Sequence, residues 1–200
     1  MEAAMKILFI ALTAYLIGSF CASIPLSRRL YGGDVRLCGS GNAGATNMAR
    51  VYGMKAGLGT LLLDMLKTVL AMLLGKYIMG SAGMAIAGAF CMIGHCFPLY
   101  FGFRGGKGVS VGAALGLMSG LPVLGAIMAI FFATAVISRK VSLGSMAAAA
   151  GLPIASWLAG AGTEMLIMNV FSALLVVFMH RSNISRLIKG TEPDFRPKNF

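Results

Sequence analysis

Apolar residues gather along the chain into long stretches, which short polar segments separate. Each stretch approaches the roughly 20 residues that one helical crossing of the hydrocarbon core of a bilayer requires. We therefore expect an all-α fold, a polytopic membrane bundle built from these helices. The expected spans are Met5 to Leu26, Met54 to Met79, Gly83 to Phe101, Val109 to Ile137, Val141 to Ala159 and Met165 to Met179.

The stretch from Val109 to Ile137 is long for one ordinary crossing and short for two. Near its middle stands Ser119-Gly120-Leu121-Pro122, which is a turn signal. If the stretch crosses twice, the basic loops and the basic tail all lie on one side, whereas a single crossing places Arg139, Lys140 and the tail outside. Cytoplasmic loops carry the excess of Lys and Arg, so we predict seven transmembrane helices, with the N-terminus outside and the C-terminus cytoplasmic.

Composition agrees with a membrane protein. Hydrophobic residues make up 58% of the chain, charged residues 12%, and the mean hydropathy is +0.85, which excludes an ordinary soluble domain. Residues 1–200 contain no internal repeat, so we expect a single integral membrane domain whose first apolar run is a retained helix rather than a signal peptide. The four cysteines have neither disulfide nor zinc spacing, so no metal site is expected.

The net charge of +11 would suit a nucleic-acid partner. However, the basic residues lie between apolar spans, and no aromatic-rich surface accompanies them. Membrane topology explains the charge better, and we expect no binding of nucleic acid.

The first polar loop combines glycines and small hydrogen-bonding side chains between two arginines. Glycine lets backbone N–H groups turn toward a phosphate, while the polar side chains add donors and the arginines add charge. A merely flexible linker needs none of these, so we favour anion binding. A G-x-G-x-x-G match here lacks the strand and crossover helix of a dinucleotide-binding fold. The candidate substrate-binding residues are Arg36, Gly39, Gly41, Asn42, Thr46, Asn47 and Arg50, and Ser40 is a candidate catalytic residue.

The second polar loop ends in Gly105-Gly106-Lys107-Gly108, immediately before another apolar helix. A cation and open backbone amides at a helix N-terminus favour phosphate, although a tight turn between helices is the alternative. The run is not a Walker A loop, because Phe101 occupies the first glycine position and Gly108 replaces the Ser or Thr that holds magnesium. ATP is therefore not implied. Lys107 is a candidate catalytic residue, and the three glycines are candidate substrate-binding residues.

The third polar cluster follows the last span. His180 and Asn183 share a face if the helix continues, and they are candidate catalytic residues. Arg186, Glu192 and, more weakly, Ser142 are candidate substrate-binding residues. The alternatives are a polar helix end for His180, membrane-surface anchors for the arginines, and helix packing for Ser142.

Three further polar residues lie within the apolar spans. Asp64 and Lys67 are three positions apart, so they share one helix face and can neutralise each other. We favour a structural ion pair over a direct substrate role for Lys67. For His95, a hydrogen-bonded core histidine and a functional group remain open, and we group it with the structural pair.

At these residues the chain resembles the bacterial acyl-phosphate:glycerol-3-phosphate acyltransferase family, over essentially its whole length. Three motifs agree in order. Two departures are Arg104, where lysine is common, and Ser110-Val111, where an Ala-Thr pair is expected, which puts in doubt any role for a Thr hydroxyl beside Lys107. The motifs run through Gly39-Ser40-Gly41-Asn42 and Thr46-Asn47, through Gly94-His95 and Gly105-Gly106-Lys107-Gly108-Val109, and through His180-Arg181, Asn183-Ile184, Arg186-Leu187 and Glu192.

The resemblance implies seven helices in the bacterial cytoplasmic (inner) membrane, with an active site that faces the cytoplasm. It implies transfer of a fatty acyl group from acyl phosphate to the sn-1 hydroxyl of glycerol 3-phosphate. The products are lysophosphatidic acid and phosphate, in the first step of phospholipid synthesis. Membrane lipid surrounds such an enzyme, and no nucleotide, coenzyme A, metal, other cofactor or obligate protein partner is implied.

The residues themselves favour direct transfer, because no Cys-His or Ser-His-Asp arrangement is apparent. The proton of the attacking hydroxyl goes to His180 or to a substrate phosphate oxygen, and the sequence leaves this choice open. An anion channel or phosphate transporter is the main rival, but the polar clusters all lie on one side. A structural membrane protein that binds anionic lipid is a third possibility.

Overall fold

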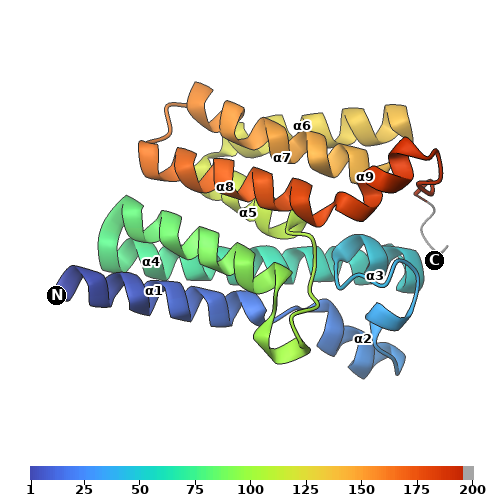
Figure 1. Ribbon diagram of the computed structural model, residues 1–200, viewed down its shortest axis with the longest axis horizontal. Helices are drawn as coiled ribbons and strands as arrows, with labels where there is room; N and C mark the ends of the chain where they lie inside the picture. The colour runs from blue at the N-terminus through green and yellow to red at the C-terminus, as the bar shows by residue number, and fades with distance from the viewer. Residues whose placement is uncertain (196–200) are drawn as a thin grey trace.

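The computed structural model describes residues 1–195, and these residues are predominantly helical and contain no strand, which confirms the expected all-α class. Figure 1 shows the long helices side by side along one axis. The helices are α1 (Glu2–Ser19), α2 (Ser23–Tyr31), α3 (Ala45–Tyr52), α4 (Met54–Cys96), α5 (Val109–Ser119), α6 (Leu121–Ser138), α7 (Val141–Leu158), α8 (Thr163–Met179) and α9 (Arg181–Ile188), with 3-10 turns η1 (Val35–Leu37) and η2 (Leu99–Phe101).

Helix α4 is a hairpin rather than one straight rod. Met79 and Gly80 leave the helical conformation, and Gly80 adopts a positive φ of 62°, which favours glycine. Figure 1 shows the two arms running antiparallel next to α1. At the turn they approach so closely that a Cβ on Gly75 or Gly83 would collide with the carbonyl oxygen of the other. The second and third expected spans are these two arms, although the third ends early, at Cys96.

The first expected span, Met5 to Leu26, lies within the apolar segment Glu2–Tyr31, but the structure breaks it near Phe20 into two helices. Helix α1 ends before Phe20, whose backbone is extended, and the chain then turns into α2. The buried Nζ of Lys67 donates hydrogen bonds to the carbonyl oxygens of Gly18 and Phe20, at 3.0 and 2.7 Å. A cation is a favourable partner for the unpaired carbonyls of a helix C-terminus. The helix is therefore able to end inside the bundle without water.

The turn expected within Val109 to Ile137 is present. Gly120 has a φ of 134° and separates α5 from α6, so this stretch forms two helices. Farther along, α8 bends by 56° into α9. The largest apolar cluster lies between these helices and the second arm of α4, and its fully buried side chains include Met92, Leu115, Leu152 and Met168.

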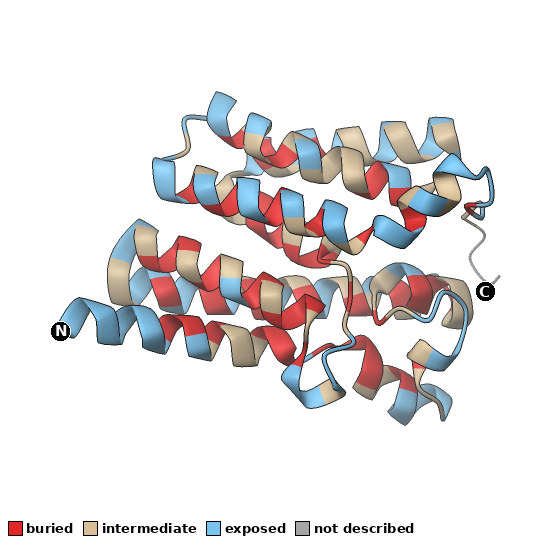
Figure 2. Ribbon diagram, in the orientation of Figure 1, coloured by how far each residue is buried: buried red, intermediate tan, exposed pale blue. Residues whose placement is uncertain are grey.

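Apolar side chains also cover the outside of the bundle. Figure 2 shows exposed residues along the outward sides of the helices, and among them are Leu8, Leu62, Leu66, Ile154 and Leu174. So much exposed apolar surface is unfavourable in water but natural in hydrocarbon. By length and composition, four helical segments of the described chain are able to cross a membrane, and α8 with α9 is a bent fifth. The four segments are Glu2–Tyr31, Met54–Phe101, Leu121–Ser138 and Val141–Leu158.

Candidate functional site

Three polar segments that are distant in the sequence meet at one end of the bundle. They are the first loop (residues 32–44, between α2 and α3), the second loop (residues 97–108, between α4 and α5) and the third segment (residues 180–195), and Figure 1 shows all three on the side of the molecule away from the N-terminus. Asn42 Nδ2 of the first loop donates to the carbonyl oxygen of Gly105 at 3.2 Å. Lys107 Nζ of the second loop donates to Asn183 Oδ1 of the third segment. The candidate residues from all three sequence clusters thus form one site.

Asn47, on α3, organises the first loop from inside. Its side chain is 2% exposed, and its Oδ1 accepts the backbone N–H of Ser40 at 2.9 Å. Gly39 has a φ of 58°, and a Cβ there would collide with Asn47 Oδ1. Asn47 and Gly39 therefore shape the loop. Asn47 Nδ2 also donates to three carbonyl oxygens, those of Val35, Cys38 and Asn42, at 3.0, 3.1 and 3.0 Å.

Other side chains on this side remain available to a ligand. Ser40 and Thr46 are exposed, Arg50 is half-buried, and none of the three has a side-chain hydrogen bond within residues 1–195. A hydroxyl group and a guanidinium group are suitable donors for phosphate. These three side chains of the first cluster therefore keep their donors for a ligand.

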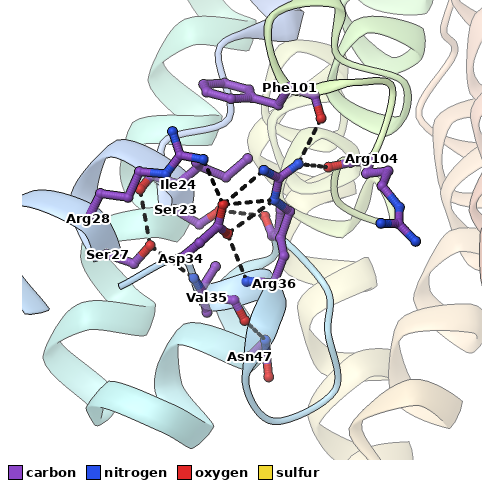
Figure 3. Close-up of polar contacts among 11 residues, drawn as sticks. Ser23, Ile24, Ser27, Arg28, Asp34, Val35, Arg36, Asn47, Phe101 and Arg104 are labelled. Atoms are coloured by element: carbon purple, nitrogen blue, oxygen red, sulfur yellow. Dashed lines mark hydrogen bonds and ion pairs between the residues drawn. The ribbon is translucent and has the colours of Figure 1, made fainter. Parts of the chain in front are cut away.

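The side chain of Arg36 joins the first loop to the second by hydrogen bonds, as Figure 3 shows. Its Nη2 donates to Asp34 at 2.8 Å, and its Nη1 donates to the carbonyl oxygens of Phe101 and Arg104 at 2.7 and 3.3 Å. The hydrogen bonds from Arg36, with a further one from Arg28, hold the pKa of the Asp34 carboxyl well below its usual range, although burial acts in the opposite direction. Arg36, predicted as a substrate ligand, uses these donors on protein groups.

Asp34 is a functional residue that the sequence analysis overlooked. It is one of only six acidic residues in the chain, and it lies close in sequence to the two arginines that it binds, Arg28 and Arg36. An isolated carboxylate in so basic a loop is a signal for an internal ion pair. Asp34 thus holds Arg36 in place within the first loop, and Arg36 makes the contacts to the second loop.

Three glycines at the end of the second loop, Gly105, Gly106 and Gly108, have close neighbours. The N–H of Gly106 donates to the carbonyl oxygen of His95 at 3.0 Å, and a Cβ on Gly106 would collide with the His95 ring. A Cβ on Gly105 would meet the His95 carbonyl oxygen, and Gly108 has a φ of 83°. The Gly106 amide is therefore engaged by the protein. The groups left for a phosphate are Lys107 and the first amides of α5, which have no acceptor within the helix.

Glu192 gathers the third segment into a network around Asn183. Its Oε1 accepts hydrogen bonds from Ser142 Oγ and Asn183 Nδ2, both at 2.6 Å, and its Oε2 accepts one from Arg186 Nε at 2.7 Å. Burial of the carboxyl favours a higher pKa, but these hydrogen bonds outweigh it and lower the pKa of Glu192. Three predicted substrate ligands, Ser142, Arg186 and Glu192, thus orient Asn183, whose Oδ1 is left for Lys107.

His180 follows the last residue of α8 and lies beside this network. Its Nδ1 lies 2.7 Å from the carbonyl oxygen of Val176, and because a carbonyl oxygen only accepts, Nδ1 carries the proton. In the neutral ring, Nε2 is then an acceptor, and it has no partner among the described residues. His180 therefore offers one proton-accepting nitrogen at the site.

Lys107 carries a charge that the protein only partly balances. Burial lowers the pKa of Lys107 to about 8, and the cations Arg186, Arg50 and Arg181 act in the same direction against the attraction of Glu192. Its hydrogen-bond partner Asn183 is neutral. Among the described residues, Glu192 is the carboxylate that attracts Lys107 most, and it is already engaged, so this group of cations is suited to an anion.

The ion pair expected within the spans is present. Lys67 Nζ lies 2.7 Å from Asp64 Oδ1 and 3.2 Å from His95 Nδ1, and all three side chains are buried. Lys67 directs its donors to groups inside the bundle. The three residues predicted as structural thus form one cluster.

An apolar cavity of about 50 Å³ adjoins the site. Val109 lies two residues after Lys107, and the carbonyl oxygen of Val176 binds His180. The lining of the cavity therefore includes neighbours of the polar site as well as residues of the apolar core, such as Leu152. The residues around it include Val109, Gly112, Ser145, Ala149, Leu152 and Val176.

Residues 1–195 hold no group of three or more His, Cys, Asp or Glu side chains that could bind a metal ion. The four cysteines are free, and only Cys38 is exposed.

The chain resembles known proteins in sequence. The family described as glycerol-3-phosphate acyltransferase matches residues 8–190. The glycerol-3-phosphate acyltransferase of Desulforamulus reducens is 43% identical over 188 residues, which cover 92% of this chain and 92% of that protein. That of Thermoanaerobacter pseudethanolicus is 42% identical over 183 residues, which cover 91% and 92%.

Solved structures share the fold. They are crystal structures of PlsY (YgiH), an integral membrane glycerol 3-phosphate acyltransferase. The glycerol 3-phosphate form has a TM-score of 0.89 at 32% identity and covers 95% of this chain and 96% of that one. The lysophosphatidic acid form has a TM-score of 0.82 at 31% identity and covers 95% of both. The chain therefore belongs to the glycerol-3-phosphate acyltransferase family.

Proposed function

We propose that this protein transfers a fatty acyl group from acyl phosphate to the sn-1 hydroxyl of glycerol 3-phosphate, in the first step of phospholipid synthesis. The observation that carries the proposal is Lys107, a partly buried cation among arginines, beside Asn183 and an apolar cavity. The glycerol 3-phosphate and lysophosphatidic acid forms of the PlsY relative support the acceptor and the product. Both substrates carry a phosphate, which such a site suits.

Each part of the site suits one part of the substrates. The phosphates would be bound by Lys107 and the first amides of α5, together with Ser40 and Arg50 of the first cluster. The first carbons of the acyl chain would leave the polar site between Val109 and Val176 beside the apolar cavity, and the rest of the chain would lie in the hydrocarbon of the membrane. Burial of each CH₂ group there contributes about 0.8 kcal/mol. One surface thus serves a substrate that is charged at one end and apolar at the other.

The chemistry requires positioning and charge stabilisation more than a protein nucleophile, because acyl phosphate is a mixed anhydride with a good leaving group. The sn-1 oxygen forms a bond to the acyl carbon, the bond from that carbon to the phosphate oxygen breaks, and inorganic phosphate leaves. Lys107 stabilises the negative charge that develops. The hydroxyl proton passes to His180 Nε2 or to an oxygen of the leaving phosphate.

Purified protein given acyl phosphate and glycerol 3-phosphate should release phosphate and lysophosphatidic acid in equal amounts, with the acyl group at sn-1. Mass spectrometry and a phosphate assay measure this, and acyl coenzyme A in place of acyl phosphate is the matched control donor. Kinetics should be sequential, because both substrates are bound before transfer. Cys38→Ala should remain active, because direct transfer forms no acyl-cysteine. Parallel-line kinetics with a trapped acyl-protein would contradict direct transfer, and transfer from acyl coenzyme A alone would contradict the proposed donor.

Lys107→Ala should lower kcat/KM by about a hundredfold to a thousandfold, because one preorganised charged donor is lost. Steady-state kinetics in detergent measure the loss. The matched control is Lys189→Ala, which removes an exposed lysine beyond α9. Near-normal kcat/KM in a folded Lys107→Ala protein would remove Lys107 from the mechanism.

We further propose that seven helices cross the inner membrane, with the site on the cytoplasmic side. The hairpin of α4 and the break at Gly120 support this number, and the one-sided basic loops support the orientation. Reporters fused after Gly80, Gly120 and Ala161 should lie outside, while fusions after Lys140 and at the C-terminus should lie inside. An outside location for the Lys140 fusion would overturn the two crossings between Val109 and Ile137.

A further inference from the structure

A buried polar cluster of Asp64, Lys67 and His95 lies directly against the second loop. The three residues are 0%, 8% and 1% exposed. Lys67 Nζ joins the cluster together, because it lies 2.7 Å from Asp64 Oδ1 and 3.2 Å from His95 Nδ1. It also binds the carbonyl oxygens that end α1, which fixes the ammonium group in place.

His95 is held in one tautomer and one orientation. An ammonium group only donates, so His95 Nδ1 accepts from Lys67, and the ring proton belongs to Nε2. The 3.6 Å between His95 Nδ1 and Asp64 Oδ1 is too long for a hydrogen bond. Asp64 therefore acts on His95 through Lys67, whose charge it neutralises.

His95 in turn fixes the second loop. Its carbonyl oxygen accepts the N–H of Gly106 at 3.0 Å. Its ring lies so close to Gly106 that a Cβ there would meet Nε2 first. Lys107 is the next residue, so any displacement of Gly106 changes the reach of Lys107 toward Asn183.

We propose that Asp64, Lys67 and His95 are positioning residues for the phosphate-binding lysine. Asp64 neutralises Lys67, Lys67 orients His95, and the carbonyl group and ring of His95 set the place of Gly106 and hence of Lys107. The inference rests on the proposed function in one respect, which is that Lys107 binds substrate phosphate. A cluster that served folding alone would change stability without changing what Lys107 contributes.

A double-mutant cycle tests the proposal. His95→Leu keeps bulk but removes the acceptor for Lys67, while His95→Asn keeps a polar atom near the position of Nδ1. His95→Leu should lower kcat/KM by about tenfold to a hundredfold, chiefly through KM for glycerol 3-phosphate, and His95→Asn should restore part of it. Lys107→Ala should cost far less in the His95→Leu protein than in the wild type. Losses that simply multiply in the double variant would overturn the proposal.

Hydrogen exchange of residues 104–109 in the ligand-free protein gives a readout independent of the reaction. Exchange at the Gly106 amide should be at least about tenfold faster in His95→Leu, because the carbonyl group of residue 95 remains but the ring that packs against Gly106 is lost. The matched control is Gly59→Ala in α4, where an added Cβ has no neighbour within 4 Å. Faster exchange in a protein whose wild type makes no lysophosphatidic acid would uphold the positioning role and reject the proposed function. Unchanged exchange would reject the positioning role.

Thermal melting in detergent verifies that each variant is folded. Should His95→Leu fail to fold, Gly106→Ala disturbs the same contact from the loop side and takes its place in the cycle. Gly106→Ala should then reduce the cost of Lys107→Ala, whereas Gly59→Ala should leave it unchanged. Independent effects of Gly106→Ala and Lys107→Ala would contradict the proposal.

Discussion

A positive charge that is removed from water inside an apolar bundle must find a partner, and the two lysines at the centre of this structure do so in different ways. Lys67 is compensated internally, by Asp64 at 2.7 Å and by the carbonyl oxygens of Gly18 and Phe20. Lys67 stands on the first arm of α4 and also contacts His95 on the second arm, so the end of α1 is joined to both arms. The fold around the second loop depends on this cluster.

Within residues 1–195, Lys107 has no such carboxylate of its own. Its hydrogen-bond partner Asn183 is neutral, and the nearby carboxylate of Glu192 is already engaged by Ser142, Asn183 and Arg186. A phosphate group bound beside Lys107 would supply the negative charge that its protein neighbours do not. Lys67 is therefore compensated within the fold, whereas the partly buried Lys107 is the cation that we propose binds the phosphate.

The amino-acid pattern predicts much of the architecture. Apolar stretches locate most of the helices, and the Ser119 to Pro122 signal locates the break between α5 and α6. The break at Phe20 cannot be predicted from the local sequence, because the partner of its carbonyl oxygen is Lys67, which lies 47 residues later in the chain. Local patterns describe each helix, whereas the partner of a helix end comes from tertiary packing.

Residue types also predict the candidate site better than they predict individual roles. Arginine, asparagine and glycine suit phosphate, but the same donors suit protein carbonyls and carboxylates. Arg36 binds Asp34, and Asn47 binds loop carbonyls, so both hold the site together. The contact of Lys107 with Asn183 joins residues 76 positions apart. Which donor meets a ligand therefore follows from the fold.

The most direct measurement of the central claim is the affinity of the purified protein for glycerol 3-phosphate, by calorimetry from about pH 7 to about pH 9.5. A phosphate monoester loses its second proton near about pH 6, so the charge of the ligand is constant in this range. Because the pKa of Lys107 is lowered to about 8, its ammonium group is charged below that pH and neutral above it. The affinity should therefore fall as the pH rises through about 8, and the fall should disappear in Lys107→Arg, whose side chain stays protonated. A constant affinity in the wild type, or the same fall in Lys107→Arg, would contradict the account.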